Sequence, residues 1–407
     1  MGSGMAKDQR TESSDATWHR FRTAIRGERL PLAIVDLDAL EANITRLCEP
    51  ARAHGKRIRV ATKSVRCPEL LGRIADASDG VVRGAMAYSA QECPDLLDHG
   101  FDDILIAYPT VQPSDLACVI DANRAGAKAR IVVDCAAHVD AMASAAREAN
   151  VRVPVVVDVD VSYRPVGALH LGVRRSPLRE ASDVLAVVQQ IAARPELRFD
   201  GIMAYEAHIA GLADVGLVRR ALKTLSRPSV LDARASIVRE LSAHGHAPAL
   251  INGGGTGSLD ANVREPTLTE IAVGSGFLAS HLFDAYRGLA LRPAAFFALQ
   301  VVRVPSEHMV TCHGGGWVAS GAAGADRLPL PVYPPGLELL DLEGAGEVQT
   351  PLHVPRGTQL AVGDPVFFRH AKAGELAEHV NEYLLVRDEK IIERVHTYRG
   401  MGRCFLG

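Results

Sequence analysis

Hydrophobic positions along most of this chain follow two alternating patterns. Short apolar runs typical of β-strands are followed by stretches in which apolar residues recur every three or four positions, the spacing of an amphipathic helix. Such alternation predicts parallel strands joined by helical crossovers. The apolar runs lie near 32–35, 58–63, 81–87, 102–107, 129–134, 153–159, 199–205, 248–252 and 269–274. The last eight are the number that closes a (β/α)8 barrel of the TIM type, so the first run belongs elsewhere.

Capping signals support the helices between these runs. Ser89 precedes a helical stretch that ends at Gly100, and Ser114 precedes one that ends at Gly126. A serine oxygen accepts a hydrogen bond from the first turn of a helix, and glycine adopts the left-handed conformation that closes one. These residues therefore predict two helix starts and two helix ends.

The pattern changes after about residue 290. The following β-type runs are broken by glycine and proline and have no long helices between them: 294–304, 308–312, 337–342, 366–368, 383–386 and 391–395. We predict an α/β protein with a barrel over 30–290 and a C-terminal antiparallel β-domain over 291–407. The polar stretch 1–29 is predicted to be a disordered or extended lead.

Composition removes several classes of function. The 407 residues carry a formal net charge of -3 with acids and bases interspersed, and only 5% are aromatic. This gives neither the basic stripe nor the stacking platforms of a nucleic-acid-binding protein. No apolar run is long enough to span a membrane, and we expect a cytoplasmic protein. The 7 cysteines are odd in number and show no C-x-x-C spacing, which argues against a disulfide framework or a zinc knuckle.

Candidate chemistry begins with Lys63, in the sequence Thr62-Lys63-Ser64 where the first barrel strand leads into a helix. Taken alone, such a lysine is most often a solvated charge. Two glycine clusters, 252–258 and 274–276, follow the seventh and eighth barrel runs. Loops at these positions commonly hold a phosphate, because glycine lets backbone N–H groups approach its oxygens.

A lysine at the end of strand 1 and phosphate loops after strands 7 and 8 suit pyridoxal 5′-phosphate (PLP), whose aldehyde forms a Schiff base with lysine. The alternative is a barrel that binds another phosphorylated ligand without a Schiff base. G-x-G-x-x-G is absent after the first strand, so a dinucleotide fold is the weaker interpretation.

Several segments carry a family resemblance. They are AIVDLDALEAN (33–43), TKS (62–64), DDILIA (102–107), Asp134 with Val139, FDGIMAY (199–205) and GGGTG (253–257). Together they resemble the D-threonine aldolase and D-serine dehydratase branch of the alanine racemase-like, fold type III PLP enzymes. The resemblance covers residues 30–290 well and the C-terminal domain loosely.

The resemblance implies a homodimer in which each barrel is completed by the other subunit's β-domain, with the strand at 31–36 joining that domain. Lys63 matches the Schiff-base lysine. His208 falls where the family has a histidine, which makes it a candidate catalytic residue, although on its own it suits a histidine at a strand end that makes an ordinary hydrogen bond. The positions that match residues lining the cofactor and its phosphate are Tyr205, Gly254, Gly255, Thr256, Gly274 and Ser275. The family's arginine-bearing segment corresponds to 160–173, which leaves Arg164, His170 and Arg174 as candidates to face the ring.

The largest departure concerns a metal. Relatives carry a His-x-Cys or His-x-Asp pair near the C-terminus for a divalent ion, whereas this chain has His370 followed by Lys372. A charged ammonium has no lone pair for a metal. Either Glu375 or His379 replaces the second ligand, or no metal binds and Lys372 supplies the positive charge. We favour the metal-free interpretation.

The resemblance implies a PLP-dependent lyase acting on β-hydroxy-α-amino acids of D configuration, by retro-aldol cleavage or by dehydration with loss of ammonia. Both reactions need a base and a group that polarises the hydroxyl, for which Lys63, His208, His370 and Lys372 are the candidates. An amino-acid racemase is the second enzyme class. A PLP-carrier protein is a third possibility, but it would lack the residues after 290.

Overall fold

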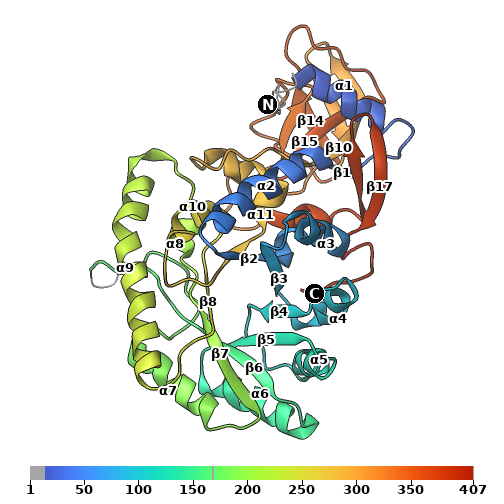
Figure 1. The fold of residues 1–407 in the computed structure, drawn as a ribbon. Helices are drawn as coiled ribbons and strands as arrows, with labels where there is room; N and C mark the ends of the chain where they lie inside the picture. Colours follow the sequence, from blue (N-terminus) through green and yellow to red (C-terminus); the bar gives the residue numbers. More distant parts are fainter. Residues whose placement is uncertain (1–13, 167–168, 407) are drawn as a thin grey trace, which may run out of the picture. The chain divides into compact units, whose positions relative to one another are not determined.

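The computed structural model describes residues 14–166 and 169–406. They form two compact units (Figure 1). The barrel unit takes Asp38–Ala294, Lys372–Asn381 and the residues from Val395 onward. The β-unit takes the described residues up to Leu37 together with Ala295–Ala371 and Glu382–Arg394. The predicted boundary at residue 290 is thus close, but 372–381 and the C-terminal tail belong with the barrel.

The barrel unit contains the closed parallel barrel that the sequence predicted. Its strands are β2 (Arg57–Ala61), β3 (Val82–Ala87), β4 (Asp103–Ile106), β5 (Lys128–Val133), β6 (Val153–Asp158), β7 (Leu197–Met203), β8 (Leu250–Gly253) and β9 (Glu270–Val273). Each strand pairs with the next, and β9 pairs with β2 to close the ring. Strands of a parallel barrel are covered on both faces, which explains why they appear in the sequence as nearly continuous apolar runs.

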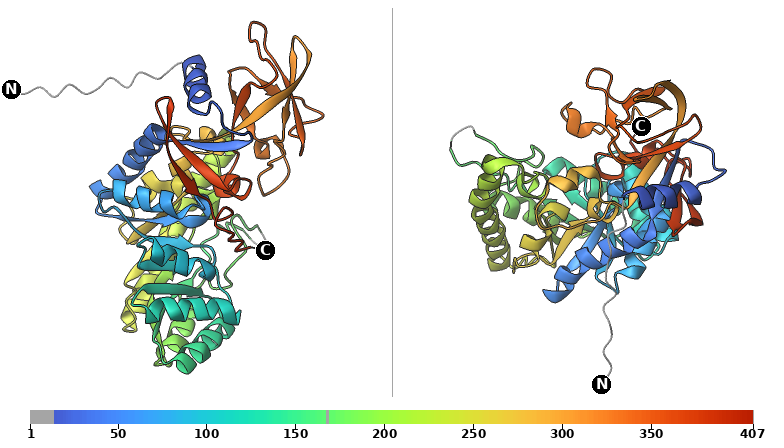
Figure 2. Two further views of the ribbon diagram at one scale, coloured as in Figure 1. Left: turned by 90° about the vertical axis from the view of Figure 1, so that its right-hand side faces the viewer. Right: turned by 90° about the horizontal axis from the view of Figure 1, so that it is seen from above.

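Helices connect the strands and cover the outside of the barrel (Figure 1). The α-helices of this unit are α2 (Leu37–Ala53), α3 (Pro68–Ala77), α4 (Cys93–Asp98), α5 (Pro113–Arg124), α6 (Ala136–Ala149), α7 (Ala181–Ala192), α8 (Ala207–Ala210), α9 (Gly216–Ala243), α10 (Leu259–Asn262) and α11 (Ser275–Leu278). Short 3-10 helices are η1 (Thr62–Ser64), η2 (Ala90–Glu92), η3 (Thr256–Ser258), η4 (His281–Ala285) and η6 (Ala373–Glu378). Figure 2 shows the long helix α9 on the outer surface of the barrel.

One of the two predicted N-terminal caps is confirmed. The Ser89 side chain accepts a hydrogen bond from the Gln91 N–H, and Glu92 completes a capping box at the start of η2. Ser114, in contrast, lies inside α5, whose first residue is Pro113. Proline suits the first helical position because its missing N–H would have no partner there, and this signal outweighed the serine that follows it.

The β-unit is a mostly antiparallel sheet. Its strands are β1 (Leu32–Asp36), β10 (Ala295–Ser306), β11 (Met309–His313), β12 (Leu330–Tyr333), β13 (Glu338–Leu339), β14 (Gln349–His353), β15 (Pro365–Arg369), β16 (Glu382–Arg387) and β17 (Lys390–His396), with the 3-10 helix η5 (Ala325–Arg327) before β12. The first apolar run is β1, which pairs antiparallel with β10 and parallel with β16. Strands β12 and β14 were not predicted from the sequence, because Pro331 and Pro351 interrupt their apolar pattern.

The predicted disordered or extended lead is wrong for its second half, since helix α1 spans Ser14–Ala24. Residues 1–13 lie outside the described part of the chain. Trp18 and Phe21 are buried in the core of the β-unit, and the Trp18 indole N–H donates to the Pro365 carbonyl at 3.1 Å. Burying an aromatic side chain of this size stabilises a fold by about 1.5–3 kcal/mol, enough to hold an otherwise polar helix in place.

Among the helices of the described residues, none combines the length with the apolar content that a membrane crossing requires. All of the cysteines are free thiols.

Candidate active site

A cavity of about 660 Å³ opens at the carboxyl ends of the barrel strands. Its lining comes entirely from the barrel unit, from the segments that follow β2, β3, β4, β6, β7, β8 and β9, and from Lys372. In barrels of this architecture the carboxyl end is where catalytic residues gather. The cavity brings together most of the residues that the sequence singled out.

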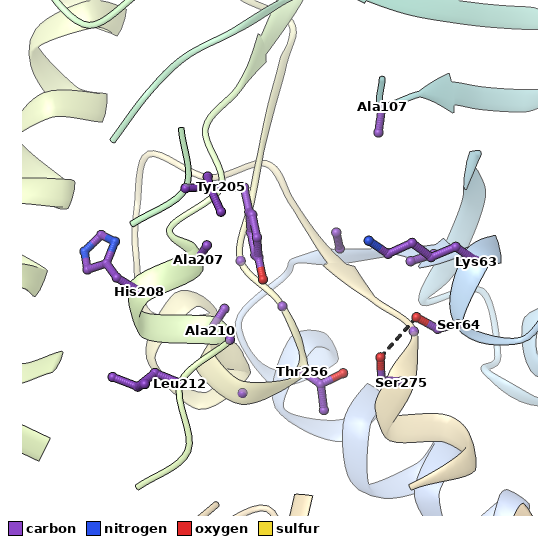
Figure 3. A pocket seen from close by; sticks show the side chains of 18 of the residues that line it. Lys63, Ser64, Ala107, Tyr205, Ala207, His208, Ala210, Leu212, Thr256 and Ser275 are labelled. Atoms are coloured by element: carbon purple, nitrogen blue, oxygen red, sulfur yellow. Dashed lines mark hydrogen bonds between the residues drawn. The ribbon is translucent and has the colours of Figure 1, made fainter. Parts of the chain in front are cut away.

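Lys63 enters this cavity from η1, directly after β2 (Figure 3). Its neighbours fix the turn: the Thr62 hydroxyl donates to the Met86 carbonyl at 3.0 Å, and the Ser64 and Ser275 hydroxyls are 3.0 Å apart. The Lys63 amine donates a hydrogen bond to the hydroxyl of Tyr108 at 2.7 Å. Lys63 therefore lies inside a pocket with its amine hydrogen-bonded to Tyr108, and it is not a solvated surface charge.

Hydroxyl groups gather on one side of the cavity. Ser64, Thr256 and Ser275 lie close together in Figure 3, and the Thr256 hydroxyl accepts a hydrogen bond from the Gly276 N–H at 3.1 Å. The surrounding backbone is packed tightly, because a Cβ atom added at Gly257 would lie 2.2 Å from the Ala210 carbonyl oxygen. This hydroxyl and glycine cluster has the donor chemistry of a phosphate site.

Two backbone donors of the glycine loop already have partners within the protein. Gly254 N–H donates to a Glu206 carboxylate oxygen at 3.1 Å, and Gly255 N–H donates to the Ser258 hydroxyl at 3.2 Å. Both donors are thus engaged inside the protein, so neither is offered to a phosphate here. Gly254 serves the turn itself, since its φ of +76° is left-handed and a Cβ there would lie 2.4 Å from Asn262.

Tyr205 and His208 both line the cavity, but they face different sides (Figure 3). The Tyr205 ring stands between Lys63 and His208, and the imidazole points away from the lysine. Burial raises the pKa of Tyr205, with a smaller contribution from the Glu206 charge, so its phenol stays protonated. Burial also lowers the pKa of His208, against the attraction of Glu206 and Asp160. The imidazole is therefore neutral and lies on the far side of Tyr205.

The arginine of this site is not one of those expected. Arg164 pairs with Asp160 at 2.6 Å, His170 bonds the Val173 carbonyl at 3.1 Å, and neither lines the cavity. Arg175 does line it, with its guanidinium carbon 5.9 Å from the ring centroids of both Tyr108 and Tyr205. Arg164 and His170, predicted from the family resemblance as cofactor contacts, thus lie outside the cavity lining, and their contact with a cofactor stays a prediction. The segment between β6 and α7 is long and irregular, so sequence spacing did not reveal which arginine turns inward.

Asp158, at the end of β6, moderates the charge of Arg175. Burial raises the pKa of Asp158 to about 7, the nearby Asp134 charge adds to this, and Arg175 opposes it. Because the pKa is raised above that of an unfolded chain, ionisation of Asp158 costs stability as the pH rises from about 4 to about 7. Near neutral pH this carboxyl is partly protonated and only partly offsets the Arg175 cation.

We therefore expect Asp158→Asn to be more stable than the parent protein at pH 8, with the difference shrinking toward pH 4. The amide cannot ionise, so the variant avoids the cost that the carboxylate carries at high pH. Urea unfolding of both proteins at several pH values measures the free energy of unfolding directly. A difference that stays constant with pH would contradict the raised pKa.

Lys372 lines the cavity, whereas the proposed metal ligands do not. His370 follows β15 in the β-unit, while Glu375 and His379 lie in and after η6 in the barrel unit. In the described part of the chain, one group of three potential ligands has its donor atoms within 4.8 Å of one another, and it consists of Asp134, Cys135 and His138. Asp134 and Cys135 of this group follow β5, His138 lies in the first turns of α6, and none of the three is a predicted ligand.

Three residues of the site escaped the sequence analysis: Tyr108, Arg175 and Glu206. The signal for Tyr108 was present, because it follows β4 just as Lys63 follows β2. Glu206 sits directly after Tyr205, in the loop that follows β7, and is 1% exposed. Its carboxylate pairs with Arg234 on α9, and it accepts hydrogen bonds from Ser258 at 3.0 Å and Asn262 at 2.6 Å. Glu206 thereby anchors the glycine loop after β8 through these hydrogen bonds.

The sequence from 35 to 258 matches the family described as alanine racemase, N-terminal domain. The chain belongs to this family. Its fold is that of alanine racemase, with a parallel barrel and a separate, mostly antiparallel sheet.

The chain is also similar to individual proteins of known activity. A 3-hydroxy-D-aspartate aldolase of Paracoccus denitrificans is 28% identical over 249 residues, which are 60% of this chain and 59% of the relative, less than two thirds of its length. The solved D-threonine aldolase of Filomicrobium marinum superposes with a TM-score of 0.78 at 19% identity, over 91% of this chain and 95% of that one. A D-threo-3-hydroxyaspartate dehydratase of Delftia sp. HT23 gives 0.72 at 18% identity, over 92% and 98%. At these identities the structures establish the fold alone.

Proposed function

We propose that this protein is a PLP-dependent lyase that acts on β-hydroxy-α-amino acids of D configuration, by retro-aldol cleavage or by dehydration and deamination. The observation that carries the proposal is the placement of Lys63, an amine inside a cavity that is also lined by a hydroxyl and glycine cluster. Relatives that are aldolases and a dehydratase of β-hydroxy amino acids support the choice of reaction.

The residues present fit PLP. The family uses this cofactor, and the cavity offers the two features that it needs: an amine to bond its aldehyde carbon and hydroxyl donors for its phosphate. Gly255 also lines the cavity, and a Cβ there would lie 3.1 Å from Ala210 Cβ, a close contact that glycine avoids. Lys63 would hold the aldehyde end, and Ser64, Thr256 and Ser275 the phosphate.

When bound, PLP holds the substrate amine and accepts the electron pair released as a bond to Cα breaks. The chain supplies the remaining chemistry. Arg175 and Lys372 place positive charge in the cavity, which suits the carboxylate of an amino acid. Lys63 and the hydroxyl groups around it hold and move protons. The homodimer implied by the family resemblance stays a prediction.

Product analysis tests the proposal. The purified protein is supplied with PLP and then with D-threonine, D-serine, 3-hydroxy-D-aspartate or D-alanine. Glycine with an aldehyde or glyoxylate identifies an aldolase, whereas a 2-oxo acid with ammonia identifies a dehydratase. Inversion of D-alanine alone would instead identify the racemase alternative. Absence of turnover with every amino acid would favour a carrier of PLP.

The Lys372 side chain yields a separate prediction about metal. We propose that its ammonium takes the place of the divalent ion in relatives, one of which, the Delftia dehydratase, has been solved as a cysteine variant in a metal-free form. We expect activity to survive exhaustive chelation. We expect Lys372→Ala to lower kcat by roughly 10²–10³-fold, the usual loss when one electrostatic donor to the transition state is removed. Steady-state kinetics before and after chelation measure both effects.

Lys390→Ala is the matched control, because this lysine is exposed at the start of β17. Activity lost to the chelator and restored by one divalent ion would contradict the metal-free proposal. Substitution of Asp134, Cys135 and His138 would then show whether their group binds that ion.

A further inference from the structure

Among the residues that the structure describes, the Lys63 amine has one hydrogen-bond partner, the hydroxyl of Tyr108. Nζ and Oη are 2.7 Å apart, and the amine lies 5.5 Å from the centre of the tyrosine ring. Tyr108 follows β4, separated from the strand by the buried Ala107, and its ring packs against the barrel-interior cluster that includes Leu105 and Val132. The ring is therefore anchored in the barrel while the hydroxyl reaches the amine.

Because the Lys63 amine is the donor of this hydrogen bond, the hydroxyl proton of Tyr108 is not used in it. Since Lys63 donates, the phenol oxygen of Tyr108 accepts, and the phenol keeps its own O–H for a second partner. No described residue accepts that hydrogen bond. Tyr108 lines the cavity, so the group it can donate to is whatever occupies the cavity.

Arg175 adds the electrostatic support that a proton-carrying phenol needs. Its guanidinium carbon lies 5.9 Å from the Tyr108 ring centroid, within the range of a cation–π contact. This contact places a positive charge beside the ring of the phenol that gives up its proton. The other candidate base, His208, has its ring on the far side of Tyr205 (Figure 3).

We propose that Tyr108 is the proton carrier of Lys63, exchanging protons between the lysine amine and the ligand in the cavity. When Nζ bonds to the aldehyde carbon of PLP, its two amine protons and the aldehyde oxygen leave as one water. Tyr108 takes a proton from Nζ and passes its own to the departing oxygen, so the phenol ends as it began.

The same exchange runs in the other direction during turnover, a part that rests on the proposed function. The Tyr108 oxygen takes the proton of the substrate β-hydroxyl while the Tyr108 proton passes to the neutral Lys63 amine, which becomes an ammonium. One proton leaves the substrate and one reaches Nζ. Tyr108 thereby carries a proton between the substrate β-hydroxyl and the Lys63 amine, and these two groups need not contact each other.

The test compares Tyr108→Phe with Tyr163→Phe. Phenylalanine keeps the packed ring and removes only the hydroxyl, and Tyr163 lies in the segment after β6, outside the cavity lining. In the first arm, cofactor-free protein is mixed with PLP, bonding to Lys63 is followed by visible absorbance, and borohydride with peptide mass spectrometry locates the bond. We expect Tyr108→Phe to slow bonding by about 10²-fold, the lower end of what an acid–base group contributes. Final affinity should stay within about tenfold, the range of one lost hydrogen bond.

In the second arm, kcat and KM are measured with the β-hydroxy-D-amino acid that the parent protein turns over. We expect kcat to fall by about 10²–10⁴-fold with KM little changed, and Tyr163→Phe to match the parent in both arms. Circular dichroism confirms that the variants are folded. Unchanged bonding rates in Tyr108→Phe would overturn the proposal. Slow bonding in a protein whose parent turns over no amino acid would support the proton carrier and reject the lyase.

Discussion

A Lys63→Ala protein will no longer form a covalent bond with PLP and, under the proposed function, its turnover of β-hydroxy-D-amino acids will fall by roughly 10³-fold or more. The expectation follows from the position of the amine, which η1 holds in the cavity and which Tyr108 contacts at 2.7 Å. Removing a residue that bonds covalently and also moves protons costs more than removing one electrostatic contact. Absorbance spectra and kinetics of the purified variant measure the two losses.

Lys128→Ala is the control for this substitution. Lys128 is exposed at the start of β5, at the opposite end of the barrel strands from the cavity. The control should bind PLP and turn over substrate as the parent protein does. If borohydride still fixed PLP to the Lys63→Ala protein, another amine would be the point of attachment and our assignment would be wrong.

Glu206→Ala will strongly lower the stability of the protein and will also loosen the glycine loop that lines the cavity. Glu206 and Arg234 are each 1% exposed and form a buried ion pair, and Arg234 also pairs with Glu265 at 2.7 Å. Removing one partner of such a pair leaves a buried charge partly uncompensated, which costs about 3–5 kcal/mol. Urea unfolding will report this loss of unfolding free energy.

The effect on the cofactor arises from the same carboxylate. Gly254, Ser258 and Asn262 all donate hydrogen bonds to it, so its removal releases the loop that carries Thr256. We expect weaker PLP binding in Glu206→Ala, measured by absorbance titration below the denaturation range. The matched control is Glu240→Ala on α9, a partly exposed side chain, for which a change within about 0.5 kcal/mol is expected.

The pH dependence of this contribution has a defined sign. Burial by itself raises the pKa of Glu206, but the Arg234 charge and the hydrogen bonds from Asn262 and Gly254 outweigh it and lower the pKa overall. A lowered pKa means that the stabilisation is present above the unfolded value near 4.5 and is lost as the pH falls through the folded value. The stability gap between parent and variant should therefore narrow in acid.

The barrel was predictable from the sequence because its physical signal is local and repeated. All eight strands lie where apolar runs alternate with helical spacing, and the glycine loops and Lys63 fall at strand ends, which any parallel barrel gathers at one face. Elements whose burial depends on distant partners were harder to predict. Helix α1 is mostly polar, and only its contacts with the β-unit core, such as Trp18 with Pro365, explain why it is ordered.

Sequence and family resemblance determined which residue types reach the cavity: a lysine after the first barrel strand, hydroxyls and glycines after the last two, and Lys372. Only the tertiary structure decided which side chains meet. Tyr108 contacts Lys63 across 45 residues of sequence, Arg175 and not Arg164 turns inward, and Glu206 occupies the N–H of Gly254. These pairings depend on how neighbouring strands and irregular loops bring side chains together in space, and no periodicity along the chain encodes such distances.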